Sequence, residues 1–254
     1  MTPSTGSSSA PSGQPHIPPT DADTFRRIPL SRSQPAAVLF DMDGTLVDSE
    51  TLWGIAIHEL AVRYGGTVSP AARLAMVGSS MAASMRILHD DLGQPWRDAA
   101  VGAAWLERRV AELFVAELPW RPGASALLRA VRAAGIPTAL VTSTARQLVE
   151  LALVTLGREN FDVIVCGDEV AATKPDPEPY LTAARLLDVP VTECVAIEDS
   201  PAGVTSAFAA GAAVLAIPGD VPLDPPDGVR LVSSLVDVDL ALLATLPTSL
   251  DPRR

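Results

Sequence analysis

Asp41 and Asp43 are the residues of this sequence whose type and spacing most clearly suit chemistry. They follow Ala36 to Phe40, an unbroken apolar run that predicts a short strand buried on both faces. Asp41 then stands at the carboxyl end of the strand, where open α/β sheets place their ligands. Two carboxylates this close favour a hard cation between them, or the protonation of one of them. An EF-hand calcium loop is excluded, because glycine is fourth rather than sixth and the twelfth residue is Leu52 rather than glutamate.

Lys174 is the only lysine among the 19 lysines and arginines of the chain. It lies in a loop whose course is restricted by Pro175, Pro177 and Pro179. A compact ammonium can lie between a carboxylate and a phosphate where a planar guanidinium does not fit. We therefore predict that Lys174 has a function in the chemistry of the protein.

Strand and helix patterns alternate from residue 122 onward. Such alternation predicts an α/β fold with a doubly wound parallel sheet, covered by helices on both faces. The expected strands are 136–141, 163–166, 194–197 and a last one at 213–217, and the expected helices are 124–134, 145–156, 179–187 and 201–210.

A helical block separates the first strand from this alternation. Residues 49–121 contain about four helical patterns and no strand candidate, and Ser69-Pro70 has the form of a helix start. The sequence thus predicts a Rossmann-like core with an inserted all-helical cap domain. The expected boundaries are a disordered tail at 1–35 rich in Pro, Ser, Thr and Gly, a core at 36–48 and 122–246, a cap at 49–121, and a tail at 247–254.

Polar residues follow the ends of several predicted strands. Asp41 ends the first strand, Thr142 and Ser143 follow the second, and Glu198 and Asp199 end the fourth. Because the carboxyl ends of parallel strands meet at one edge, we expect these side chains to gather there with the lysine described above. The predicted site combines carboxylates, hydroxyls and one ammonium.

Composition limits the classes of partner. A formal charge of -11 disfavours nucleic acids and anionic membranes, whose phosphates would be repelled. No apolar stretch is long enough to span a bilayer, and the first residues lack the pattern of a secretory signal. Cys166 and Cys194 are isolated in apolar runs, so we expect two buried thiols in a cytoplasmic protein. We expect the protein to be a monomer.

Four motifs occur in a fixed order along the chain. They are D-x-D-G-T after a strand, a hydroxyl residue after the next strand, K-P-D-P-x-x-Y, and E-D-S-x-x-G before a helix. In this order they resemble the haloacid dehalogenase superfamily, in its branch of phosphatases and phosphomutases with a helical cap inserted after the first motif. The resemblance covers roughly residues 36–246.

The resemblance implies a magnesium-dependent phosphatase for a small phosphate monoester, such as a sugar phosphate. Asp41 would be the nucleophile that forms an aspartyl-phosphate, and Asp43 the general acid and base. Thr142 and the main-chain amide of Ser143 would bind the phosphate, with Lys174 balancing its charge.

The resemblance also implies a set of metal ligands. Asp199 would hold Mg²⁺ together with the carboxylate of Asp41 and the main-chain carbonyl of Asp43. Glu198 would support this metal site from beside it.

Other reactions of the superfamily are weighed by single residues. Asp43 disfavours a dehalogenase, and the absence of lysine from residues 49–121 disfavours a phosphonate hydrolase. A β-phosphoglucomutase remains the main alternative, but Trp53 stands where that subfamily has histidine and Met81 where it has arginine. A non-catalytic binding protein of the same fold is a further alternative.

The cap offers further candidates for contact with the leaving group. We expect Trp53 and Met81 to face it or to pack within the cap, and Ser79, Ser80 and Arg86 to be able to reach it. We expect solvated or packed side chains without chemistry at His58 and His89. Solvated helix faces are expected at Arg63, Arg73, Arg108 and Arg109.

Overall fold

A computed structural model describes Met1 and residues 34–77, 79–219 and 221–246. Nearly all of the predicted tail at 1–35 and the whole predicted tail at 247–254 lie outside the described residues. The sheet, its helices and the candidate site all belong to the compact unit formed by residues 32–254. No helix in the described part is both long enough and apolar enough to cross a membrane.

Among the described residues, six parallel strands form one sheet in the order β3-β2-β1-β4-β5-β6. The central position of β1 explains its unbroken apolar run, since both faces of a central strand in a covered sheet are buried. The strands are β1 (Ala37–Phe40), β2 (Thr138–Val141), β3 (Val163–Val165), β4 (Cys194–Glu198), β5 (Ala213–Ala216) and β6 (Arg230–Leu231).

Helices pack on both faces of this sheet. Val38 and Phe40 of β1 belong to one buried cluster, and Ala37 and Leu39 to another, as the two-residue period of a strand requires. The first cluster includes residues of α5 (Ala124–Ala133), α6 (Arg146–Leu156) and α9 (Leu240–Thr245); the second includes residues of α7 (Glu178–Leu186) and α8 (Pro201–Ala210). The predicted doubly wound α/β fold is therefore confirmed.

One element of the sheet differs from the prediction. The strand at β5 is not the last, because β6 pairs with it in parallel through Leu215 and Arg230. Both residues of β6 are exposed, so this edge strand lacks the apolar run by which the other strands were predicted.

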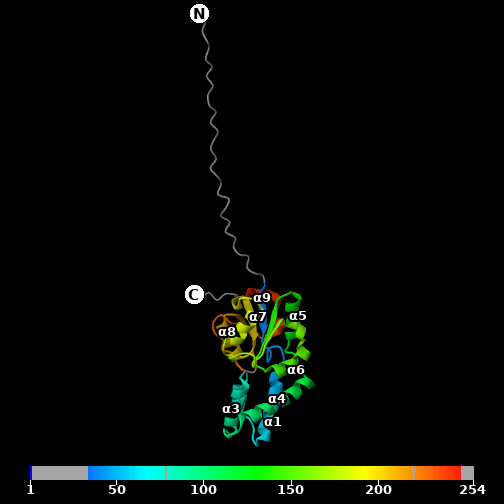
Figure 1. Cartoon of the computed structure of the whole chain (residues 1–254), viewed down its shortest axis with the longest axis vertical. Helices are drawn as coiled ribbons and strands as arrows, with labels where there is room; N and C mark the ends of the chain where they lie inside the picture. The colour runs from blue at the N-terminus through cyan, green and yellow to red at the C-terminus, as the bar shows by residue number, and fades with distance from the viewer. Residues whose placement is uncertain (2–33, 78, 220, 247–254) are drawn as a thin grey trace. The chain divides into compact units, whose positions relative to one another are not determined.

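In the described part of residues 41–121, four helices follow β1 before the chain returns to the sheet. They are α1 (Ser49–Arg63), α2 (Pro70–Met76), α3 (Met81–Asp91) and α4 (Ala99–Ala116). We call them the helical insertion. Figure 1 shows α1, α3 and α4 gathered together, with α6 lying between them and the rest of the helices around the sheet. The helix start predicted at Ser69 is present, because its hydroxyl accepts a hydrogen bond from the main-chain N of Ala72 at 3.1 Å.

The two connections between the insertion and the sheet run side by side. The main-chain N of Asp48 donates to the carbonyl of Pro119 at 2.8 Å, and that of Arg121 donates to the carbonyl of Leu46 at 2.9 Å. The chain therefore leaves the sheet and returns to it at one place. The exact domain boundaries, and any hinge at these connections, stay predictions.

The pairing of the strands determines which residues lie side by side at the edge of the sheet. Phe40 is paired with Leu140 on one side and with Ile197 on the other. The next residues, Asp41 and Glu198, therefore lie at the same carboxyl edge of the sheet.

Candidate active site

Lys174 lies between two carboxylates at this edge. Its Nζ donates to Oδ1 of Asp41 at 2.6 Å, to Oε1 of Glu198 at 2.6 Å and to the carbonyl of Val141 at 2.9 Å. These contacts use all three donors of the ammonium. The exposed fractions of the three charged side chains are 4% for Lys174, 8% for Asp41 and 0% for Glu198. Charges buried this deeply are stable only when they are paired and hydrogen-bonded, as they are here.

Glu198 is held by a side chain of α7 and by the residue that precedes α8. Its Oε1 accepts a hydrogen bond from the hydroxyl of Tyr180 at 2.5 Å, and its Oε2 accepts one from the hydroxyl of Ser200 at 3.2 Å. Gly203, in the first turn of α8, leaves room for this carboxylate, since a Cβ there would lie 2.0 Å from it. The start of α8 is thus shaped around Glu198.

Negative charge exceeds positive charge at this edge. Carboxylate oxygens of Asp41, Glu198 and Asp199 lie within 4.8 Å of one another, with Lys174 as their cation. Burial, followed by the charge of Glu198, raises the pKa of Asp41 to about 8, although Lys174 opposes the shift. Burial, followed by Asp41, Glu198 and then Glu50, raises the pKa of Asp199 well above its usual range.

The pKa of Lys174 shifts in the direction expected for a cation next to carboxylates. Burial disfavours its ammonium form, but the neighbouring carboxylates of Asp41 and Glu198 outweigh burial and raise the pKa of Lys174 above its ordinary value. Lys174 therefore stays charged at neutral pH.

The donor atoms suit a divalent cation. Oδ2 of Asp41 is buried and has no hydrogen-bond partner, although a carboxylate oxygen out of water normally has one. An all-oxygen set with excess negative charge is the kind that Mg²⁺ prefers. Gly44, with a φ of 79°, allows the close approach of Asp199, because a Cβ at Gly44 would lie 2.0 Å from Oδ2 of that aspartate. The residues present therefore fit a site for a divalent cation.

Asp43 is held by three hydroxyls. It accepts hydrogen bonds from Ser49 Oγ at 2.7 Å, from Thr144 Oγ1 at 2.8 Å and from Thr142 Oγ1 at 3.1 Å. The hydroxyl of Thr142 also accepts a bond from the main-chain N of Thr144 at 3.0 Å. In this structure the Thr142 side chain therefore positions Asp43. The hydroxyl of Ser143 is buried and has no partner.

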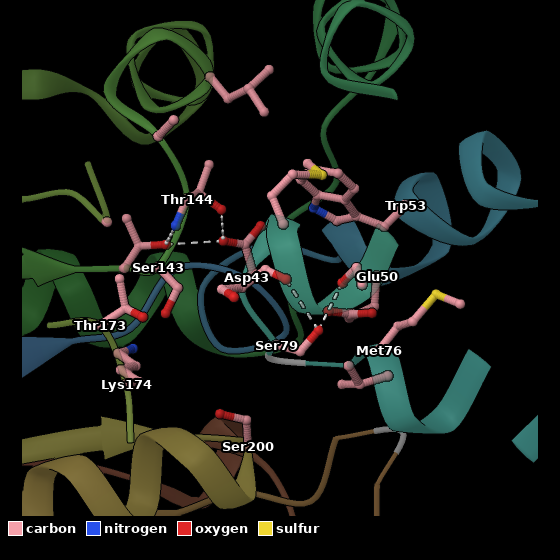
Figure 2. A pocket seen from close by; sticks show the side chains of 18 of the residues that line it. Asp43, Glu50, Trp53, Met76, Ser79, Ser143, Thr144, Thr173, Lys174 and Ser200 are labelled. Atoms are coloured by element: carbon pink, nitrogen blue, oxygen red, sulfur yellow. Dashed lines mark hydrogen bonds between the residues drawn. The ribbon is translucent and has the colours of Figure 1, made fainter. Parts of the chain in front are cut away.

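One pocket joins this edge to the helical insertion. Its lining includes Asp41, Asp43, Lys174 and Asp199 from the sheet edge. Figure 2 shows Lys174, Thr173 and Ser143 on one side of Asp43, and Glu50, Trp53, Met76 and Ser79 on the other. The predicted site residues are thus brought to one place, and the roles assigned to them stay predictions.

Most of the residues of the helical insertion that were expected to reach the leaving group line this pocket. Trp53, Ser79, Ser80 and Met81 line it, whereas Arg86 is exposed on α3 and is not part of the lining. Arg86 lies on the helix face turned to solvent, and a single helix pattern does not reveal which face a neighbouring element will cover.

The expectation for Arg73 was wrong. Its Nη2 donates to Oε2 of Glu50 at 2.9 Å and to the carbonyl of Glu50 at 2.8 Å, and Arg73 lines the pocket. The exposed fraction of its side chain is 22%. The pair joins α2 to the first turn of α1, a contact that the sequence separation of 23 residues does not indicate.

The two cap histidines take no part in the site. His58 is exposed. His89 is buried against the ring of Tyr64, with 5.7 Å between ring centroids. Among the described residues, the acidic cluster that could hold a metal contains no histidine.

Several residues around the site were assigned no role from the sequence. Ser49 and Thr144 hold Asp43, and Tyr180 and Ser200 hold Glu198. The available signal was weak: Tyr180 ends K-P-D-P-x-x-Y, Ser200 lies within E-D-S-x-x-G, and hydroxyl residues are common in turns.

The fold and this centre together define an α/β enzyme that places a buried aspartate, a lysine and a candidate cation site at one edge of a parallel sheet. A model of the haloacid dehalogenase-like hydrolases matches residues 35–211, and the chain belongs to this family.

The chain is also similar to individual proteins and to solved structures. The chain is 37% identical to hexitol phosphatase A of Escherichia coli (strain K12) over 205 residues, which cover 80% of this chain and 88% of that protein. It is 37% identical to protein CbbY of Cereibacter sphaeroides over 196 residues, or 72% and 84% of the two chains. A crystal structure of CbbY from Rhodobacter sphaeroides in complex with phosphate superimposes with a TM-score of 0.69 at 30% identity, covering 80% of this chain and 96% of that one.

Proposed function

We propose that the chain is a magnesium-dependent phosphatase that hydrolyses a small phosphorylated metabolite, a sugar phosphate or a related compound, through an aspartyl-phosphate. The family and the phosphatases among its relatives make the chain a phosphoric monoester hydrolase. The observation that supports the finer proposal most directly is the Asp41 carboxylate, with Oδ1 held by Lys174 and Oδ2 buried without a partner.

In the first step Asp41 attacks phosphorus, and the bond between phosphorus and the oxygen of the leaving alcohol breaks. Two unit negative charges 4 Å apart repel by about 4 kcal/mol at an effective dielectric constant near 20. Lys174 offsets this repulsion next to the nucleophile. Mg²⁺, held by the carboxylates of Asp41 and Asp199 and the main-chain carbonyl of Asp43, with Glu198 beside it, would supply further positive charge.

Asp43 transfers the protons. It donates one to the oxygen of the leaving alcohol, and then accepts one from the water that attacks the aspartyl-phosphate and releases Asp41. Ser49, Thr142 and Thr144 fix the position of its carboxylate for both steps. The hydroxyl and main-chain amide of Ser143 are available to the oxygens of the phosphoryl group.

The mutase alternative is less well supported. Trp53 and Met81 both line the pocket, so the histidine and arginine expected of a β-phosphoglucomutase are missing from positions where they would reach a substrate. Incubation with β-glucose 1-phosphate separates the two activities, because a mutase yields glucose 6-phosphate and a phosphatase yields free phosphate. The charged groups of the site are all retained, which disfavours a purely binding role.

The proposal is tested by phosphate release from a panel of phosphorylated sugars, polyols and glycolate. We expect turnover with Mg²⁺ and none in excess chelator. Asp41→Asn should lower kcat by at least about a thousandfold while the protein stays folded. Asp162→Asn is a matched control, because Asp162 precedes β3 at the opposite edge and pairs with Arg132 at 2.6 Å. If Asp41→Asn turns over substrate as fast as the control variant, Asp41 is not the nucleophile.

We also propose that the protein acts as a monomer in the cytoplasm. Cys166 and Cys194 are buried and unpaired, which is usual for proteins of a reducing compartment. Size-exclusion chromatography with light scattering tests the oligomeric state.

A further inference from the structure

The pocket next to Asp41 is acidic on both of its sides. Among the described residues that line it, the cations are Arg73 and Lys174, and Lys174 is already bound to Asp41 and Glu198. Apart from the aspartates of the candidate centre, the lining contains three more carboxylates, those of Glu50, Glu107 and Asp168. An anion that enters beside the reacting phosphate thus meets an excess of negative charge.

Arg73 does not provide a site for a second anion. Its guanidinium is paired with Glu50 at 2.9 Å, and the exposed fractions of the two side chains are 22% and 12%. A second phosphate or carboxylate that took Arg73 as its partner would leave the largely buried Glu50 carboxylate without this cation. Removing one partner of a pair shielded from water is costly, so the pair opposes such a ligand.

Glu107 adds to this effect from another element. It lies on α4, lines the pocket and makes no ion pair with another described residue. Negative charge is therefore contributed by both α1 and α4 of the helical insertion.

The other pocket-lining residues of the helical insertion discussed here are uncharged, and several of them are polar. The hydroxyls of Ser79 and Ser84 lie 2.7 Å apart, and Ser80 lines the pocket beside them. Hydroxyls both donate and accept hydrogen bonds, so they suit the hydroxyls of a ligand. Trp53 and Met76 offer apolar surface on the same side, as Figure 2 shows. A carbon chain bearing hydroxyls matches this mixture.

We infer that the substrate has a single phosphate and that its leaving group is an uncharged polyhydroxy compound. Glu50 and Glu107 exclude a second anionic group, and Arg73 is kept from binding one by its pair with Glu50. This inference rests on the proposed phosphatase activity and narrows its substrate class.

The test compares two esters that differ in one group. Glucitol 6-phosphate and gluconate 6-phosphate have the same chain length, but gluconate has a carboxylate in place of the terminal hydroxymethyl group. We expect kcat/KM for gluconate 6-phosphate to be lower by at least about tenfold, mainly through KM. Each compound is also measured as an inhibitor of the best ester in the panel, so that its affinity is known even if it is not hydrolysed.

Variants that replace a glutamate by the uncharged glutamine show which carboxylates cause the preference between the two esters. Glu50→Gln removes the negative charge that is paired with Arg73 while the bond of Arg73 to the main-chain carbonyl of Glu50 can remain, and Glu107→Gln removes a carboxylate without touching that pair. Each should raise the preference for gluconate 6-phosphate relative to glucitol 6-phosphate, by about tenfold for Glu50→Gln. Glu59→Gln is the control, because Glu59 is also on α1 but pairs with Arg109 at 2.7 Å outside the pocket lining. It should leave the preference unchanged.

The outcomes separate this inference from the proposed function. Equal kcat/KM or equal inhibition constants for the two esters in the parent protein would overturn the inference while leaving the phosphatase intact. A preference that neither glutamate variant changes would also overturn it. If Glu50→Gln does not fold, Glu107→Gln decides the question. Phosphate release from no ester at all would overturn the proposed function, and the inference with it.

Discussion

At the scale of single residues, the clearest feature of the site is the set of hydroxyls around Asp43. Ser49 begins α1, Thr142 and Thr144 follow β2, and each of the three donates to this carboxylate. A general acid and base must be aligned with the oxygen it serves, so the hydroxyls act on the rate through Asp43.

Removing one of these donors gives a residue-scale prediction. Thr144→Val deletes the 2.8 Å hydrogen bond to Asp43, and we expect kcat to fall by about ten- to a hundredfold with little change in KM. Thr144→Ser keeps the hydroxyl and should keep most of the activity. A steady-state comparison of the two variants checks this. If Thr144→Val and Thr144→Ser have the same kcat, the hydroxyl does not position Asp43.

The sequence predicted which residues would meet at the sheet edge, but not all of what they contact. Asp41 and Asp199 follow strand ends, and the sole lysine lies in a proline-rich loop, so strand-end geometry was enough to bring them together. The contact of Thr142 with Asp43 and the pair of Arg73 with Glu50 depend on side-chain rotamers and on how α2 packs, which no local pattern contains.

At the scale of elements, the start of α8 is adapted to the carboxylate before it. The helix begins at Pro201, and the hydroxyl of Ser200 accepts a hydrogen bond from the main-chain N of Gly203 at 3.1 Å. Glu198 occupies the space that a side chain at Gly203 would need. The sequence predicted this helix correctly from its pattern and the following glycine, whereas the need for glycine inside it follows only from the packing.

Two glycine substitutions test this packing. Gly203→Ala should lower the free energy of unfolding by at least about 2 kcal/mol, because its Cβ would lie 2.0 Å from the Glu198 carboxylate. Gly54→Ala, in α1, is a matched control whose Cβ would meet Arg73 at an ordinary 3.5 Å. We expect it to be neutral or to stabilise by up to about 1 kcal/mol. Denaturant unfolding measures both, and equal effects would contradict the packing argument.

At the scale of the whole molecule, the sheet edge concentrates charge that the protein alone does not balance. Asp41, Glu198 and Asp199 share one lysine within the fold. Burial, with the charge of Glu198 adding to it, raises the pKa of Asp41 to about 8. The stability of the metal-free protein should therefore depend on pH.

The sign of this dependence follows from the raised pKa. Between the ordinary value of 3.8 and about 8, the folded chain holds a proton on Asp41 that the unfolded chain has lost. The contribution of Asp41 to the free energy of unfolding therefore falls as pH rises through this range. Mg²⁺ binds the ionised carboxylates, so we expect it to raise Tm more at about pH 8.5 than at about pH 5.5.

Thermal unfolding with Mg²⁺ and with chelator at both pH values checks this prediction. Asp41→Asn, which cannot ionise at that position, should show a smaller difference between the two pH values. A Tm shift on adding Mg²⁺ that is larger at the acidic pH would contradict the placement of the cation at Asp41.

The fold as a whole was predictable because every strand except β6 has an apolar run, and the connections between β1 and β5 contain helical patterns. What the sequence could not supply was β6, whose two exposed residues pair with β5 only because the chain returns there after a long loop. The strand order likewise follows from packing.

The paired connections at Leu46–Arg121 and Asp48–Pro119 have a consequence for engineering. Both junctions of the insertion lie against each other, so its four helices could be exchanged as a cassette with those of a relative, joined at the same two points. A chimera of this kind would keep the reacting groups of one parent and take its choice of ester from the other.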